Sequence, residues 1–294
     1  MKYKLQNTLI VTISLLFSNG IYSKENMKTC EKLLDNNQYQ EALNQANNAL
    51  KANKNDYKAT FCHGQVNLKL NKNDDALNDF SKADKLAKDN IDHSMARLLQ
   101  GITLKESKRL DEALGFFKDA LLNTQTNMPF KRLYLNEMGE IYLLLNQSDN
   151  AAQALIEAYS LAANDNERAS NLDRIAYAYA VSKNFSKAIE YELKANLAYD
   201  RAGLLGEYAD SGINLATYYM EANDLTSAER TLIKFEKLAR DNGGMYFLAK
   251  ALYVESRYYK KKSDLALSQS KLDEAYKIAN EIGAEDLKTL FKGN

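Results

Sequence analysis

The stretch YKATFCHGQVNLKLNKNDDALNDFSKA, residues 57–83, carries the pattern that decides the fold. Its small residues Gly64, Ala76 and Ala83 are separated by twelve and seven positions. Apolar side chains three or four positions from such residues share one face of an α-helix, and the small residues allow a second helix to approach closely. A polar run around Asn71 separates the two halves, and asparagine tolerates the left-handed backbone conformation that ends a helix. The stretch therefore predicts two antiparallel helices joined by a tight turn.

The same pattern recurs along the chain at intervals of 34, 37, 38, 37, 40 and 40 residues. Its central small position is Ala42, Ala76, Ala113, Ala151, Ala188, Ala228 and Ser268. Twelve residues earlier stand Cys30, Gly64, Gly101, Gly139, Ala176, Ala216 and Ser256. Three or four residues after the central position stand Phe80, Phe117, Leu155, Tyr191, Leu232 and Leu272. Asparagine occupies the turn at Asn37, Asn71, Asn146 and Asn223. A period of this size marks a chain of helix pairs, each too small to bury its own apolar face.

These positions resemble the tetratricopeptide repeat family, in an exported bacterial form, over residues 24–282. The resemblance is clear in the set Gly139, Tyr142, Ala151, Leu155 and Ala158. It implies an all-α fold, a right-handed α-solenoid of about seven helix-turn-helix repeats and fourteen helices. The chain departs from the family by lacking its early tryptophan and the proline that ends the second helix. The only proline, Pro129, is expected to open the first helix of the fourth repeat.

Residues 283–294 are expected to form a C-terminal cap. A short helix from about Ala284 to Lys292 would place Leu287, Leu290 and Phe291 on one face. Such a face can cover the end of the last repeat, as terminal units of a repeat array require.

Residues 1–23 have the pattern of a secretory signal peptide. Lys2 and Lys4 precede an uncharged run over residues 8–17, and small residues lead to a cleavage site expected after Ser23, with cleavage after Gly20 and an uncleaved anchor as the alternatives. The run is too short to span a bilayer, and no later apolar segment has membrane length. The mature protein is therefore expected to be periplasmic or secreted, with no stable membrane insertion after cleavage.

The two cysteines, Cys30 and Cys62, lie on the expected first helices of neighbouring repeats. Export would favour a disulfide between them, because oxidation is favoured outside the cytoplasm. The alternative is that each is a small buried apolar residue, and we favour it because facing helices are often too far apart for the short cystine bridge.

No pattern of residues predicts an enzyme, a cofactor or a metal site. The glycines form no nucleotide-binding loop, and the two histidines, His63 and His93, have no partners at zinc-ligand spacing. We expect His63 to be a partly buried structural residue. The chain has 39 basic and 39 acidic residues, and removal of Lys2 and Lys4 leaves 37 against 39, so it lacks the basic surface that nucleic acid requires.

The family resemblance implies that the first helices line a concave groove that binds an extended peptide or a helix. Carried onto this sequence, the expected partner-binding residues are Phe61, Leu98, Ile102, Asn136, Tyr177, Ile213 and Tyr253. Buried apolar anchors with a polar rim suit a protein or peptide partner.

The sequence thus predicts a non-enzymatic scaffold or adaptor for a partner in the cell envelope. A ligand-sensing or regulatory module of a signalling system is the alternative. Neither the partner, the pathway nor the oligomeric state follows from these residues.

Overall fold

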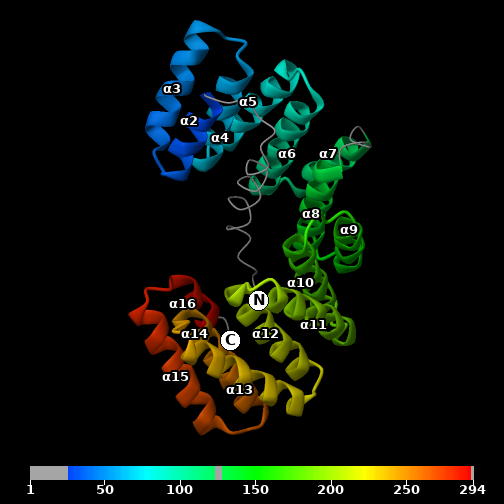
Figure 1. The fold of residues 1–294 in the computed structure, drawn as a ribbon, viewed down its shortest axis with the longest axis vertical. Helices are drawn as coiled ribbons and strands as arrows, with labels where there is room; N and C mark the ends of the chain where they lie inside the picture. Colours follow the sequence, from blue (N-terminus) through cyan, green and yellow to red (C-terminus); the bar gives the residue numbers. More distant parts are fainter. Residues whose placement is uncertain (1–25, 123–127, 293–294) are drawn as a thin grey trace. The chain divides into compact units, whose positions relative to one another are not determined.

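The computed structural model describes residues 26–122 and 128–292, and the described residues form two compact units. The N-terminal unit, up to Leu145, contains seven of the described helices (Figure 1). They are α2 (Asn26–Asp35), α3 (Tyr39–Ala52), α4 (Tyr57–Lys69), α5 (Asn73–Leu86), α6 (Asn90–Glu106), α7 (Leu110–Leu122) and α8 (Met128–Leu144). Each of these helices packs against its neighbours in the sequence, and α4 also contacts α2, as α6 contacts α8.

The C-terminal unit, from Asn146, contains the remaining eight described helices. They are α9 (Ser148–Ser160), α10 (Asp165–Val181), α11 (Phe185–Arg201), α12 (Leu205–Glu221), α13 (Leu225–Asp241), α14 (Met245–Lys261), α15 (Leu265–Glu281) and α16 (Glu285–Lys292). We call α2, α4, α6, α8, α10, α12 and α14 the first helices, and α3, α5, α7, α9, α11, α13 and α15 the second helices. Figure 1 shows α12 to α15 side by side, with α16 next to α14.

The predicted fold class is confirmed. The fourteen expected helices are present in order, Pro129 lies in the first turn of α8, and the described residues contain no strand. The predicted cap is α16, which packs on α14 and α15. Leu287 and Phe291 are buried there, and Leu290 is partly buried against the same core.

The small residues bring the two helices of a repeat together as expected. A Cβ atom added at Gly64 would lie 2.8 Å from the Phe80 ring, and one added at Gly101 would overlap the Phe117 ring. Phe80 and Phe117 are fully buried, so neither ring has free space to move into. The absence of a side chain at Gly64 and Gly101 therefore leaves room for the aromatic ring from the second helix of the same repeat.

Gly101→Ala is expected to lower the free energy of unfolding by about 1–3 kcal/mol, because the new methyl group overpacks the contact with Phe117. Gly115→Ala, in the neighbouring helix α7, is the matched control. No atom lies within 4 Å of a Cβ added at Gly115, and alanine favours a helix over glycine by about 1 kcal/mol. Urea denaturation should show that Gly101→Ala lowers the free energy of unfolding and that Gly115→Ala raises it. A change of the same sign in both variants would contradict the helix positions assigned to these glycines.

The turn inside each repeat uses the left-handed backbone conformation. The predicted asparagines have positive φ angles, 58° at Asn37, 57° at Asn71, 58° at Asn146 and 65° at Asn223. The remaining three turns place Lys108, Lys183 and Ser263 in the same conformation. The turns that follow α11, α13 and α15 instead use glycine, at positions 203, 243 and 283. The backbone N–H groups of such residues donate hydrogen bonds to carbonyls in the last turn of the preceding helix, as Asn71 does to Leu68 and Gly203 to Asp200, and the helix ends there.

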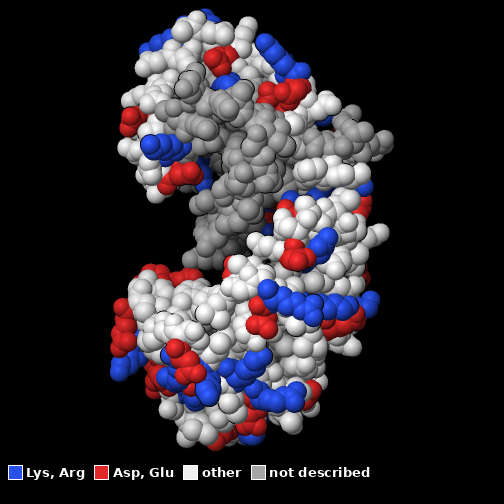
Figure 2. Space-filling view, viewed as in Figure 1, with Lys and Arg blue, Asp and Glu red and all other residues white. Residues whose placement is uncertain are grey.

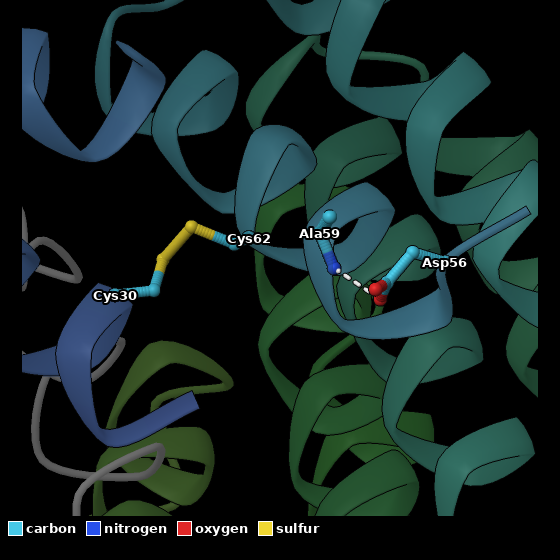
Figure 3. The surroundings of a disulfide bond; sticks show 4 residues. All are labelled: Cys30, Asp56, Ala59 and Cys62. Carbon is cyan, nitrogen blue, oxygen red and sulfur yellow. Dashed lines mark hydrogen bonds between the residues drawn. A yellow bond between two sulfur atoms is a disulfide. The ribbon is translucent and has the colours of Figure 1, made fainter. Parts of the chain in front are cut away.

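Our preference for two free cysteines was wrong, because the structure joins Cys30 and Cys62 in a disulfide (Figure 3). Their Cα atoms are 6.1 Å apart, within the range that a cystine spans. Cys30 stands at the small helix-contact position of the first repeat, where α2 contacts α4. Both cysteines are buried in a small core with Val66.

Asp56 caps the start of α4, accepting a 3.0 Å hydrogen bond from the backbone N–H of Ala59.

The predicted signal peptide, residues 1–23, lies outside the described residues. Within the described part of the chain, no helix combines the length and apolar character needed to cross a membrane.

Candidate functional site: the first helices of the repeats

The predicted partner-binding residues of the N-terminal unit are mostly buried. Phe61 is 1% exposed, and its ring packs edge-on against Phe80, with ring centroids 5.6 Å apart. Leu98 and Ile102, on α6, are 3% and 2% exposed. Asn136, on α8, is 9% exposed, and its Oδ1 atom has no hydrogen-bond partner among the described residues. Asn136 is thus the member of this group with an unused polar atom.

The predicted residues of the C-terminal unit differ in exposure. Ile213 is buried in the core of α12 and α13, and the ring of Tyr253 stacks on Phe291 of α16 at 4.7 Å. Tyr177 is only half-buried on α10. Six of the seven predicted anchors are therefore buried within their unit, and their role in partner binding stays a prediction. Substituting any of the five apolar or aromatic residues among these six is expected to lower stability and binding together.

Charged side chains connect the first helices of the N-terminal unit. Lys105 Nζ, on α6, lies 2.5 Å from Glu137 Oε2 and 2.8 Å from Glu140 Oε2, both on α8. All three side chains are less than one-tenth exposed. Burial lowers the pKa of the Lys105 ammonium, but the two carboxylates raise it above its usual range. The cluster therefore keeps a charged lysine inside the contact between two first helices.

The first helices of the C-terminal unit are connected in the same way. Lys250, on α14, forms an ion pair with Asp210 on α12, and Arg257 Nη2 lies 2.7 Å from Glu221 Oε1. Lys261 Nζ donates a 2.6 Å hydrogen bond to the carbonyl of Met220. These groups leave a charged, hydrogen-bonding strip along α12 and α14.

The sequence analysis missed these charged pairs, although a signal for them exists. The partners are about one repeat period apart in sequence, 35 residues for Lys105 and Glu140 and 36 for Glu221 and Arg257. Opposite charges one period apart on first helices therefore predict contacts between neighbouring repeats.

Large apolar residues are exposed at one repeated position on three second helices. Five residues after the central alanine stand Ile156, Leu193 and Ile233, which are 37%, 46% and 60% exposed. Nothing in the structure shows what covers them.

The other polar groups singled out in the sequence have structural partners. His63 Nδ1 lies 2.7 Å from Asp79 Oδ2, and this hydrogen bond raises the pKa of the imidazole above its usual value. The described residues contain no group of three or more histidine, cysteine or acidic side chains able to hold a metal ion. Acidic and basic residues are interspersed on the face shown in Figure 2, without a large patch of one sign.

Residues 32–91 match the tetratricopeptide repeat family model. FK506-binding protein 59 of Drosophila melanogaster is 31% identical over 123 residues, which are 41% of this chain and 28% of that protein. The chain therefore corresponds to under a third of the length of this curated relative. The residues that match the family model run from within α2 to the start of α6.

Solved structures share the fold at low sequence identity. The apo form of RapI superposes with a TM-score of 0.70 at 14% identity, over 90% of this chain and 79% of that one. A tetratricopeptide repeat-containing protein of Cytophaga hutchinsonii gives 0.62 at 17% identity, over 86% and 93%. A chain of the APC/C heterotetramer Cut9–Hcn1 gives 0.57 at 18% identity, over 97% of this chain and 52% of that one. With the helix-pair architecture, these similarities show that the chain has the fold of tetratricopeptide repeat proteins, and residues 32–91 also match the family model.

Proposed function

We propose that this protein is an exported scaffold or adaptor that holds a peptide or helix of an envelope protein along its first helices. The tetratricopeptide repeat fold is a protein-binding scaffold, and the charged strip on α12 and α14 offers a polar rim for such a partner. Contacts between first helices join α2 to α4 and α6 to α8 in the N-terminal unit, and α12 to α14 in the C-terminal unit.

The observation that carries the export part of the proposal is the disulfide between Cys30 and Cys62. Disulfides persist in oxidising compartments such as the bacterial periplasm and are rare in the cytosol. The expected leader over residues 1–23 supports the same location. Cell fractionation, N-terminal sequencing and thiol labelling test it together. We expect a periplasmic chain that begins near Lys24 with both thiols blocked; a cytoplasmic chain that keeps Met1 and two free thiols would contradict it.

Tyr177→Ala is expected to weaken partner capture by about fivefold or more, which corresponds to ~1 kcal/mol. Tyr177 is half-buried on α10, so its removal leaves the core largely intact and the melting temperature close to that of the wild type. Binding of the purified full chain to its identified envelope partner measures the effect.

Two variants serve as controls for Tyr177→Ala. Leu98→Ala removes a residue that is 3% exposed and should lower stability along with binding. Ile233→Ala removes an exposed residue on the second helix α13 and should change neither. A loss of binding confined to Ile233→Ala would place the partner on the second helices instead.

A ligand-sensing or regulatory module is the alternative function. It predicts that a small metabolite from an envelope extract raises the melting temperature of the purified protein, because a ligand that binds the native state stabilises it. If an envelope protein raises the melting temperature and no metabolite does, the result supports the scaffold function.

A further inference from the structure

One repeat carries an acid where the others carry an apolar core residue. Four residues after the central small position stand Phe80, Phe117, Leu155, Leu232 and Leu272, but the fifth repeat has Glu192. Tyr191, expected to fill the apolar position of that repeat, is only half-buried. The structure instead turns Glu192 into the core, where it is 0% exposed.

The carboxyl group of Glu192 is poorly satisfied in this core. By distance and angle neither of its oxygens has a well-formed hydrogen bond to a described residue, and its polar neighbours are the buried Ser211 hydroxyl and the Asp173 carboxyl group. An ionised carboxylate without a partner is very costly to bury, so such a group takes up a proton instead.

The polar groups around Glu192 come from α10, α11 and α12. Asp173 on α10 and Asp210 and Ser211 on α12 act on its carboxyl group directly, and Tyr199 on α11 and Tyr218 on α12 lie near it. Arg174 and Glu207 lie near Tyr199, and Tyr177 lies near Tyr218. Burial and the nearby charge of Asp173 raise the pKa of Glu192 well above its usual value, and the Ser211 hydroxyl opposes this rise. Lys250 forms an ion pair with Asp210.

We propose that Glu192 is a proton-operated switch in the core of the fifth repeat, which holds α10, α11 and α12 together when protonated and loosens them when ionised. The inference rests on the position and burial of this side chain and does not depend on the proposed function. A proton reaches a fully buried group through brief local opening, so the switch needs no cavity.

The direction of the pH dependence follows from proton binding. The native state keeps the Glu192 proton to a higher pH than the unfolded chain, whose glutamates titrate near pH ~4.3. Between those two pKa values the native state binds one more proton, so its stability decreases as pH rises. The local unfolding constant should increase up to about tenfold per pH unit within that window.

Hydrogen exchange of the full chain between about pH 5 and pH 8 tests the switch, with correction for the intrinsic exchange rate. The wild type should show opening of α10–α12 that grows with pH relative to α14 and α15. Glu192→Gln, which mimics the protonated form, should abolish this growth. Glu192→Leu supplies the residue type found at Leu155 and Leu232 and should also remove it.

Glu190→Gln is the matched control on the same helix, because Glu190 is exposed and pairs with Lys194 at 2.6 Å. It should leave the pH dependence of α10–α12 unchanged. Equal pH dependence in wild type and Glu192→Gln would overturn the proposal. If neither Glu192→Gln nor Glu192→Leu folds, the wild type alone decides the question. Hydrogen-exchange rates in α10–α12 that keep a constant ratio to those in α14 at every pH would also overturn the proposal.

Discussion

Removal of the Cys30–Cys62 disulfide is expected to lower the free energy of unfolding of the N-terminal unit by about 2–4 kcal/mol. The bridge closes a segment with a sequence separation of 32 residues and ties α2 to α4. An end repeat has a neighbour on one side only, so α2 and α3 depend strongly on this bond. Its loss should free both helices before the rest of the unit unfolds.

Urea denaturation with and without a reducing agent measures this effect. The double variant Cys30→Ser with Cys62→Ser is the control, because a reducing agent should destabilise the wild type and leave this variant unchanged. Hydrogen exchange should report the loss first in α2 and α3. An identical midpoint for oxidised and reduced wild type would show that the bridge does not support the first repeat.

Phe291→Ala is expected to lower the free energy of unfolding of the last repeat by about 3 kcal/mol. Phe291 is 3% exposed, stacks on Tyr253 and packs edge-on against Tyr276 at 5.2 Å. Its removal leaves a cavity between α16 and the α14–α15 pair, and the short helix has few other buried residues to hold it.

Lys292→Ala, one position further along α16, is the matched control because Lys292 is exposed. Circular dichroism melting and exchange in α14–α16 should separate the two variants clearly. Equal melting of Phe291→Ala and wild type would mean that α16 is not the cap of the repeat array.

The fold was predictable because the residue spacing within each repeat is enough to define its pair of helices. The spacing of Gly64, Ala76 and Ala83 defines one helix pair, and the left-handed asparagines mark its turn. The same pattern recurs seven times, so the helices and their order follow from it. Even the cap was visible, because Leu287 and Phe291 share one helix face.

The candidate site was less predictable, because a family position does not tell whether a side chain points into the groove or into the core. Phe61 and Ile213 were expected to meet a partner, yet they fill contacts between helices of their own unit. Tyr253 is covered by α16, which follows it by almost a full repeat. Tyr177, by contrast, retains exposed surface.

The disulfide and the buried acid show two further limits of the sequence. The distance between α2 and α4 depends on three-dimensional packing, which spacing alone does not give, so Cys30 and Cys62 were assigned as free thiols. Glu192 was passed over because the neighbouring Tyr191 also fits an apolar pattern. A one-residue difference in register decides which of the two enters the core.

Site-specific photo-crosslinking in cells tests the central claim, that a partner binds along the first helices, most directly. A photoreactive amino acid is placed at Tyr177 on α10 in one version of the full chain and at Ile233 on α13 in another. The account predicts that position 177 crosslinks to one defined envelope protein and that position 233, which is 60% exposed, does not. Crosslinks to that protein from position 233 and none from position 177 would contradict it.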